Sequence, residues 1–208
     1  MAPLDTLIAP FLTRRISEQQ VAQLELYLDL LLKWNARISL TAIRGREEIA
    51  RRHFGESLFA AEQLSSNSDA TLADFGSGAG FPGLPIAIHL PHFEVTLIES
   101  QQKKVAFLRE VIRTLSLKNA SVFAGRAESS GLKSQIVTLR AVERFESILP
   151  VAAALVAAGG RLALLIGSGQ AETARRTLPA IEWGRPIPIP QSRERILLIG
   201  TSVDSEMA

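Results

Sequence analysis

The feature that most constrains this chain is a glycine-rich turn that follows a short apolar segment containing an acid. The apolar run Ala70–Phe75 has the length of a buried strand, and Asp74 lies near its end. Pro82, a residue typical of helix starts, lies in a turn that also holds Gly76, Gly78, Gly80 and Gly83. Glycine permits positive φ angles and a close approach of the backbone to another group. Strand, turn and helix together are typical of a loop that holds a small ligand against backbone N–H groups.

Alternating segments follow this turn and predict a doubly wound, Rossmann-like α/β fold. Apolar runs predict strands at Ala70–Phe75, Phe93–Glu99, Ala120–Ala124, Ile136–Leu139, Arg161–Ile166 and Arg195–Gly200. Helical patterns occupy Gly83–Leu90, Gln101–Ser116, Arg144–Ala157 and Gly169–Leu178, and the pair Gly159-Gly160 is expected to end the third helix. Short connections between the two kinds of element indicate a parallel sheet covered by helices on both faces, with ligands at the carboxyl ends of the strands.

An amphipathic helical region precedes the sheet. Ser17 and Gln20 form a capping-box pattern, and leucines recur at helical spacing through residues 17–34. Arg46–Leu64 is also helical in pattern, and the polar residues 65–69 are typical of a linker. We therefore expect a helical N-terminal layer, residues 1–69, packed on a main domain of residues 70–208 that binds the ligand.

Composition excludes several classes of protein. The chain has 208 residues and no cysteine, which excludes disulfides, thiolate zinc sites and cysteine nucleophiles. No apolar run approaches the roughly 18 residues of a membrane span, and the N-terminus lacks the pattern of a secretion signal. We expect a cytoplasmic monomer with no metal and no membrane partner.

Basic residues gather between positions 33 and 53, although the net charge is only +2. Two interpretations stay open for this segment: a solvated helix face, or a surface that faces phosphates. His53 lies in the same segment, and a lone histidine after two arginines is expected to pack or to form hydrogen bonds rather than to catalyse. Arg193 and Arg195, near the end of the chain, are expected on a solvated face.

The ends of the predicted strands bring polar residues to one crevice. Strand one supplies Asp74, strand two Glu99, strand three the run Gly125–Glu128, and strand four Arg140. A carboxylate at Glu99 suits hydrogen bonds from two ribose hydroxyls. A dinucleotide would place its pyrophosphate at the helix N-terminus, where Asp74 would repel it, whereas the sulfonium and ammonium groups of S-adenosylmethionine tolerate this acid. The contrast favours a methyltransferase over a dehydrogenase.

Several motifs carry a family resemblance. They are Trp34-Asn35, Leu40-Thr41-Ala42-Ile43, Arg52-His53-Phe54 with Ser57-Leu58, the whole run from Asp74 to Gly83, Lys103-Lys104, Phe107-Leu108-Arg109, Gly125-Arg126-Ala127-Glu128, and Thr138 with Arg140-Ala141-Val142. Over residues 24–167 the chain resembles the bacterial RsmG (GidB) family of 16S rRNA guanine-N7 methyltransferases. It departs from the family pattern at Glu56, Leu139 and Ile166, where members usually carry aspartate, serine and lysine.

The resemblance implies a class I methyltransferase sheet and methyl transfer from S-adenosylmethionine to N7 of a guanine in 16S rRNA, as free RNA or in the small ribosomal subunit. Arg140 is the predicted catalytic residue, because it would orient the guanine or the cofactor carboxylate without taking a proton. With the strand-end acids included, the predicted cofactor-binding residues are Asp74, Gly76, Gly78, Gly80, Phe81, Glu99, Ala127, Glu128 and Arg140.

RNA contacts are predicted at basic residues around the crevice, namely Arg51, Arg52, Lys103, Lys104 and Arg126. The two lysines begin a helix, where the dipole disfavours cations, and this conflict favours a functional use. Guanine N7 carries no proton, so no general base is required. Two alternatives stay open: a methyltransferase acting on another RNA or a small molecule, and a noncatalytic rRNA-binding assembly factor.

Overall fold

The computed structural model describes residues 2–66, 68–140 and 144–203 of the chain. A central eight-stranded sheet has the order β3-β2-β1-β4-β5-β8-β6, with β7 paired to β8. The first five strands are parallel: β1 (Ala70–Phe75), β2 (Phe93–Glu99), β3 (Ala120–Ala124), β4 (Ser134–Arg140) and β5 (Val156–Gly167). The strands β6 (Ile181–Trp183), β7 (Ile187–Pro188) and β8 (Arg195–Ser202) complete the sheet in antiparallel pairs. Strand order reverses between β1 and β4, which is where doubly wound sheets bind ligands.

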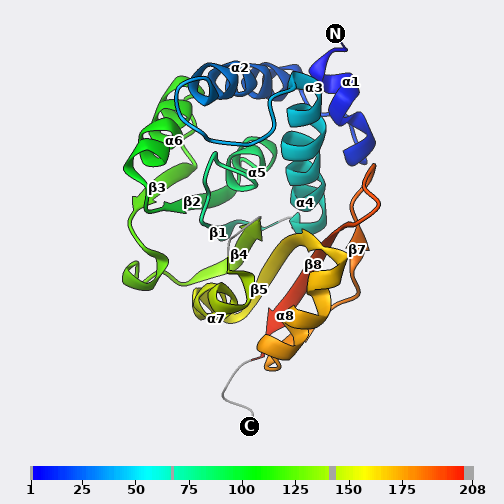
Figure 1. Cartoon of the computed structure of the whole chain (residues 1–208), viewed down its shortest axis with the longest axis vertical. Coiled ribbons are helices and arrows are strands. Elements are labelled where there is room, and N and C mark those ends of the chain that lie inside the picture. The colour runs from blue at the N-terminus through cyan, green and yellow to red at the C-terminus, as the bar shows by residue number, and fades with distance from the viewer. Residues whose placement is uncertain (1, 67, 141–143, 204–208) are drawn as a thin grey trace.

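Helices cover both faces of this sheet (Figure 1). Those of the N-terminal layer are α1 (Leu4–Ile8), the 3₁₀ turn η1 (Ala9–Phe11), α2 (Glu18–Asn35), α3 (Arg46–Ile49), the π-helical segment η2 (Ala50–Gly55) and α4 (Glu56–Leu64). Those that follow β1 are α5 (Gly83–His89), α6 (Gln102–Thr114), η3 (Ala127–Ser129), α7 (Phe145–Ala154), η4 (Ser168–Gln170) and α8 (Ala171–Thr177). The predicted fold class, α/β with a helical N-terminal segment, is confirmed.

Alternation along the strands divides the core into two clusters. Leu72 and Ile136 face one cluster, which includes residues of the N-terminal layer, α5 and α6. Ala73 and Val137, one residue further along, face the second cluster, which includes residues of α7 and α8. Side chains of a strand point alternately to the two faces, so each central strand has one apolar set for each layer. The N-terminal layer therefore shares its core with the sheet.

The helix α2 begins as the sequence predicts. The Ser17 hydroxyl accepts a hydrogen bond from the Gln20 backbone N–H (3.2 Å), and the Gln20 side chain accepts one from the Ser17 N–H (3.0 Å). The same Gln20 amide reaches across to the Ile88 carbonyl at the end of α5 (3.0 Å). The cap thus fixes the start of α2 and also ties the N-terminal layer to the sheet domain.

One predicted helix end is wrong. The helix expected at 144–157 ends at Ala154, and Gly159 and Gly160 lie inside β5 instead of stopping a helix. Gly159 has φ +66°, and a Cβ on Gly160 would lie 2.8 Å from the carbonyl oxygen of Gln135. The pairing of β4 with β5 shifts register in this region. The glycine pair therefore marks a strand irregularity, a common use of glycine in sheets.

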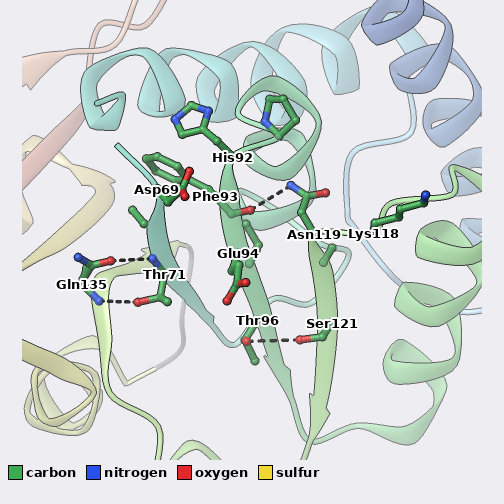
Figure 2. A pocket seen from close by; sticks show the side chains of 14 residues that line it. Asp69, Thr71, His92, Phe93, Glu94, Thr96, Lys118, Asn119, Ser121 and Gln135 are labelled. Carbon is green, nitrogen blue, oxygen red and sulfur yellow. Dashed lines mark hydrogen bonds between the residues drawn. The ribbon is translucent and has the colours of Figure 1, made fainter. Parts of the chain in front are cut away.

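A polar hollow of about 760 Å³ lies over the amino-terminal halves of β1, β2 and β3 (Figure 2). Thr71 and Gln135 join β1 and β4 there by two hydrogen bonds (2.9 and 3.1 Å). This hollow is at the opposite end of the strands from the glycine turn. None of the described helices is long and apolar enough to cross a membrane.

Candidate functional site

The glycine turn connects β1 to α5 in a conformation that only glycine adopts readily. Gly76, Gly78 and Gly80 have φ angles of +64°, +58° and +91°. A Cβ on Gly80 would also lie 2.6 Å from the Tyr27 hydroxyl, whereas a Cβ on Gly78 would meet nothing closer than 3.8 Å. Gly80 is therefore packed against the protein, while Gly78 has open space beside it. Positive φ and close packing are the two uses of glycine that the sequence predicted for this turn.

The carboxylate of Asp74 supports the glycine turn through hydrogen bonds. Its Oδ1 accepts a hydrogen bond from the Thr138 hydroxyl (2.8 Å), and its Oδ2 accepts one from the Gly83 N–H (3.2 Å). The side chain has no exposed surface. Burial raises the pKa of this carboxyl to about 6, against the hydrogen bonds from Thr138, Ser77 and Gly83 and the charge of Arg140. Asp74 therefore joins β1, β4 and α5, and its contact with a cofactor stays a prediction.

Glu99 connects three segments at the carboxyl end of β2. Its Oε2 accepts a hydrogen bond from the Gly78 N–H (3.0 Å), and its Oε1 accepts one from the Gln101 N–H (2.8 Å). Its backbone carbonyl accepts a further bond from the Gly125 N–H (3.1 Å). The structure thus brings the glycine turn and the start of α6 to the carboxylate of Glu99, and the turn after β3 to its backbone carbonyl. Each carboxylate oxygen has a second lone pair, which leaves acceptor capacity for ligand hydroxyls.

The segment after β3 supplies the third side of the crevice. Ala127 is buried in η3, while Arg126 and Glu128 on either side of it are exposed. The Ser129 hydroxyl donates to the Arg126 carbonyl (2.8 Å) and closes this short turn. A small buried residue thus lies between two exposed charged residues in the turn after β3.

Phe81 lies inside an aromatic cluster formed with the N-terminal layer. Its ring stacks on His53 (centroids 4.8 Å apart) and on Tyr27 (5.3 Å), and it contacts Phe54 edge-on (5.1 Å). The hydroxyl of Tyr27 donates to the carbonyl of Ala79 in the glycine turn. The ring of Phe81, predicted to contact the cofactor, is thus largely buried among aromatic side chains. The cluster fixes the conformation of the turn from the side of the N-terminal layer.

Arg140 ends β4, and its guanidinium is turned toward the N-terminal layer. Nη2 donates to Glu56 (2.9 Å) and to the carbonyl of Arg52, and Nη1 donates to the carbonyl of His53 (3.3 Å). Burial lowers the pKa of Arg140 to about 10, and the Glu56 carboxylate opposes this shift. Arg140 therefore stays cationic at neutral pH. Ala141 and Val142 of the same motif lie outside the described residues.

The expectation that Arg195 lies on a solvated face is wrong. Its Nε donates to Glu56 (2.9 Å), and its Nη2 lies 3.4 Å from the carbonyl of Leu165. The antiparallel pairing of β8 with β5 sets Arg195 opposite Gly167, at the same edge of the sheet as Arg140. This position depends on a strand pairing that the sequence did not reveal. Arg193 is exposed, as predicted.

His53 packs and forms a hydrogen bond, as the sequence predicted. Its Nε2 lies 2.7 Å from the Thr41 hydroxyl, and its ring stacks on Phe81. Burial, together with the charges of Arg140, Arg52 and Arg195, lowers the pKa of His53 to about 3. The imidazole is therefore neutral at physiological pH. It lies in the π-helical segment Ala50–Gly55, a kind of irregularity often found at functional sites.

The predicted RNA-binding residues lie on the surface of several elements. Arg51 pairs with Glu47 (3.3 Å), and Lys103 and Lys104 lie in the first turn of α6. Lys103 is exposed and Lys104 half-buried. These placements leave their contact with RNA a prediction. Among residues 2–66, 68–140 and 144–203, no three His, Asp or Glu side chains gather as metal ligands would.

Three residues of this site are absent from the sequence prediction: Tyr27, Glu56 in its role as ion-pair partner, and Arg195. Tyr27 had a readable signal, because it is the only tyrosine of the chain and lies within a leucine stripe. A buried tyrosine hydroxyl usually has a hydrogen-bond partner. The Glu56–Arg195 pair had no such signal, since its two residues are 139 positions apart.

Comparison with known proteins identifies the family. The family model "rRNA small subunit methyltransferase G" (GidB) matches residues 20–182. The ribosomal RNA small subunit methyltransferase G of Chloroflexus aggregans is 38% identical over 201 residues, covering 90% of this chain and 84% of the relative. The protein of the same name from Roseiflexus sp. (strain RS-1) is 37% identical over 207 residues, covering 93% and 88%.

Solved structures support the fold. A SAM-dependent methyltransferase from Aquifex aeolicus superposes with a TM-score of 0.61 at 15% identity, over 75% of this chain and 93% of that chain. The YcgJ protein of Bacillus subtilis gives a TM-score of 0.60 at 12% identity, over 74% and 100%. Because the family model spans most of the chain and these curated relatives align over most of their length, the chain belongs to the GidB family of rRNA small subunit methyltransferases.

Proposed function

We propose that this protein transfers a methyl group from S-adenosylmethionine to N7 of a guanine in 16S rRNA, as free RNA or in the small ribosomal subunit. The observation that carries the proposal is the hydrogen bond from the Gly78 N–H to the Glu99 carboxylate. This bond lies where the strand order of the sheet reverses, and the chain belongs to a family of rRNA methyltransferases. A substrate in ribosomal RNA implies that the enzyme acts in the cytoplasm.

The residues of the crevice fit a nucleoside with a ribose diol. The Glu99 carboxylate is held by two backbone N–H groups and retains acceptor capacity for ribose hydroxyls. Gly78 has open space beside it, and we expect a flat base to lie beside the small side chain of Ala127, which is buried in the turn after β3. Gly76 is exposed at the mouth of the turn. When bound, the cofactor supplies an activated methyl group on a sulfonium.

The chemistry requires alignment more than proton transfer. In this transfer the bond from N7 to the methyl carbon would form as the bond from that carbon to sulfur broke, and no proton would leave the guanine. A neutral His53, with its pKa near 3, is consistent with a site that uses no general base. The protein's contribution is to hold the two reactants in line. Positive charge would pass from sulfur to the purine, and the fixed carboxylate of Glu99 lies at the carboxyl end of β2.

The test measures both the binding of a cofactor analogue and the transfer of the methyl group to RNA. We expect Glu99→Gln to weaken S-adenosylhomocysteine binding at least tenfold in calorimetry, because the amide N–H₂ would face a backbone N–H where the carboxylate now accepts. The matched control is Glu94→Gln, an exposed acid on the same strand that lines the hollow of Figure 2. Wild type incubated with labelled S-adenosylmethionine and 16S rRNA or small subunits should yield 7-methylguanosine. Label in another nucleoside, or in none, would contradict the proposed function.

A further inference from the structure

Glu56 is a buried carboxylate at the meeting point of the N-terminal layer and the sheet. It begins α4, directly after the π-helical segment, and its side chain is 4% exposed. Its Oε2 accepts hydrogen bonds from Arg140 Nη2 and Arg195 Nε, both at 2.9 Å. The two arginines lie at the carboxyl end of β4 and the start of β8. One oxygen atom thus fixes two cations from different strands.

The charges around Glu56 are unbalanced. Arg52 Nε lies 4.0 Å from Glu56 Oε1, so three guanidinium groups surround one carboxylate. The side chain of Arg140 is only 6% exposed, and a buried cation is costly unless it is paired. Glu48 Oε1 lies 3.9 Å from Arg52 Nη1, but the side chain of Glu48 is exposed to solvent. Asp74 also attracts Arg140, but Glu56 is the acid that contacts both Arg140 and Arg195, and three guanidinium groups share it.

The two arginines differ in how much of their donor capacity the protein uses. Arg140 donates to Glu56, to two backbone carbonyls and weakly to the Ser57 hydroxyl (3.5 Å). Arg195 uses Nε and Nη2, and its Nη1 has no partner among the described residues. Its side chain is 20% exposed. Glu56 holds Nε of Arg195, while Nη1 stays available in a side chain that is partly exposed.

We propose that Glu56 is a positioning residue of the methyltransferase site: its carboxylate orients Arg195 against Arg140, so that Arg195 can bind an anionic oxygen of a reactant. The inference rests on the proposed function. The anionic oxygen belongs either to an RNA phosphate or to the carboxylate of the cofactor. Planar guanidinium groups suit both, and the measurements below distinguish them.

The test compares Glu56→Gln with Glu56→Asp. The amide keeps the shape of the side chain but aims N–H donors at a guanidinium, whereas aspartate keeps the charge. We expect Glu56→Gln to lower kcat/KM for 16S rRNA at least tenfold, per folded molecule, and Glu56→Asp to recover most of that loss. The control is Glu110→Gln, which breaks an exposed pair with Arg113 (2.9 Å) on α6 and should stay near wild type.

A role in stability alone makes a different prediction. Glu56→Gln would then lower the melting temperature, while kcat/KM per folded molecule stayed unchanged. A double-mutant cycle with Arg195→Gln separates these cases, because residues that act as a unit are not additive. If the two residues act as a unit, the kcat/KM of the double variant should be little lower than that of either single variant. Affinity for S-adenosylhomocysteine assigns the anion: weakened affinity points to the cofactor carboxylate, and unchanged affinity to an RNA phosphate.

Two outcomes would overturn the proposal: kcat/KM of Glu56→Gln within threefold of wild type, or full additivity with Arg195→Gln. If Glu56→Gln does not fold, Arg195→Gln and Arg195→Lys decide, and wild-type activity in both would overturn it. A wild-type protein that methylates no RNA would instead contradict the proposed function. In that case the cofactor carboxylate would be the only anion left to consider. Unchanged S-adenosylhomocysteine affinity in both Glu56→Gln and Arg195→Gln would then overturn the inference.

Discussion

At the scale of single residues, the site contains two buried acids whose carboxylates form hydrogen bonds within the protein. Asp74 and Glu99 each accept two hydrogen bonds, and at least one donor to each is a backbone N–H of the turn or of the residues that follow it. A buried carboxylate fixed by backbone donors is more precisely placed than an exposed one. Asp74 holds Thr138 and Gly83 in this way, and its attraction for a sulfonium stays a prediction.

The pKa of Asp74 gives a prediction about stability. A carboxyl raised from 3.8 to about 6 binds a proton in the folded state that the unfolded chain has already released. Its contribution to folding is therefore fully present below pH 3.8 and is lost as pH rises through 6. Relative to wild type, Asp74→Asn should gain stability on the order of 2 kcal/mol between pH 4 and pH 7.

Urea unfolding at several pH values measures this difference. Glu94→Gln, which removes an exposed acid from the neighbouring strand, controls for the loss of one negative charge. Any constant cost of placing an amide opposite two donors cancels, because only the change with pH is compared. A difference between Asp74→Asn and wild type that does not vary with pH would contradict the raised pKa.

At the scale of elements, the N-terminal layer holds the glycine turn. The hydroxyl of Tyr27 in α2 donates to Ala79, and His53 in the π-helical segment stacks on Phe81. The same segment supplies the carbonyls of Arg52 and His53 that hold Arg140 at the end of β4. Helices that precede the sheet in sequence therefore shape both sides of the crevice.

Tyr27→Phe tests this support. The change keeps the ring stacking but leaves the Ala79 carbonyl without its donor, and an unpaired buried acceptor costs about 1–3 kcal/mol. We expect a loss of unfolding free energy in that range and severalfold weaker binding of S-adenosylhomocysteine. Denaturation and calorimetry provide the two numbers. Wild-type values for both would show that α2 does not hold the turn.

Sequence reasoning worked best where local chemistry decides the structure. The bounds of β1, β2 and β3 match the prediction to the residue, because apolar runs end at glycines, prolines or charged residues. Sequence reasoning failed where contacts between segments distant in the sequence determine the structure. The glycine pair at 159–160 is shaped by pairing of β5 with β4, and the Glu56–Arg195 ion pair joins residues that no periodicity connects. The glycine turn and Glu99 could be read from the sequence, and Tyr27 carried a signal as the only tyrosine in a leucine stripe, whereas the pairing of Glu56 with Arg195 could not be read.

At the scale of the whole molecule, the boundary predicted near residue 69 separates two parts that share a core. Leu24, Leu28 and Phe54 from the N-terminal layer lie in one buried cluster with Leu84 and Phe107 from the sheet domain. Removing residues 1–69 would expose the apolar residues of α5, α6 and the sheet that share this cluster with the layer. We expect residues 70–208 alone to lack a cooperative unfolding transition in circular dichroism. A cooperative transition would mean that the sheet domain folds without the layer.

The most direct test of the central claim is mass spectrometry of nucleosides from 16S rRNA of cells that lack the gene for this chain. The proposed function predicts the loss of one 7-methylguanosine from 16S rRNA, with restoration by the wild-type gene and not by a Glu99→Gln variant. An unchanged 7-methylguanosine content of 16S rRNA in the deleted cells would contradict it.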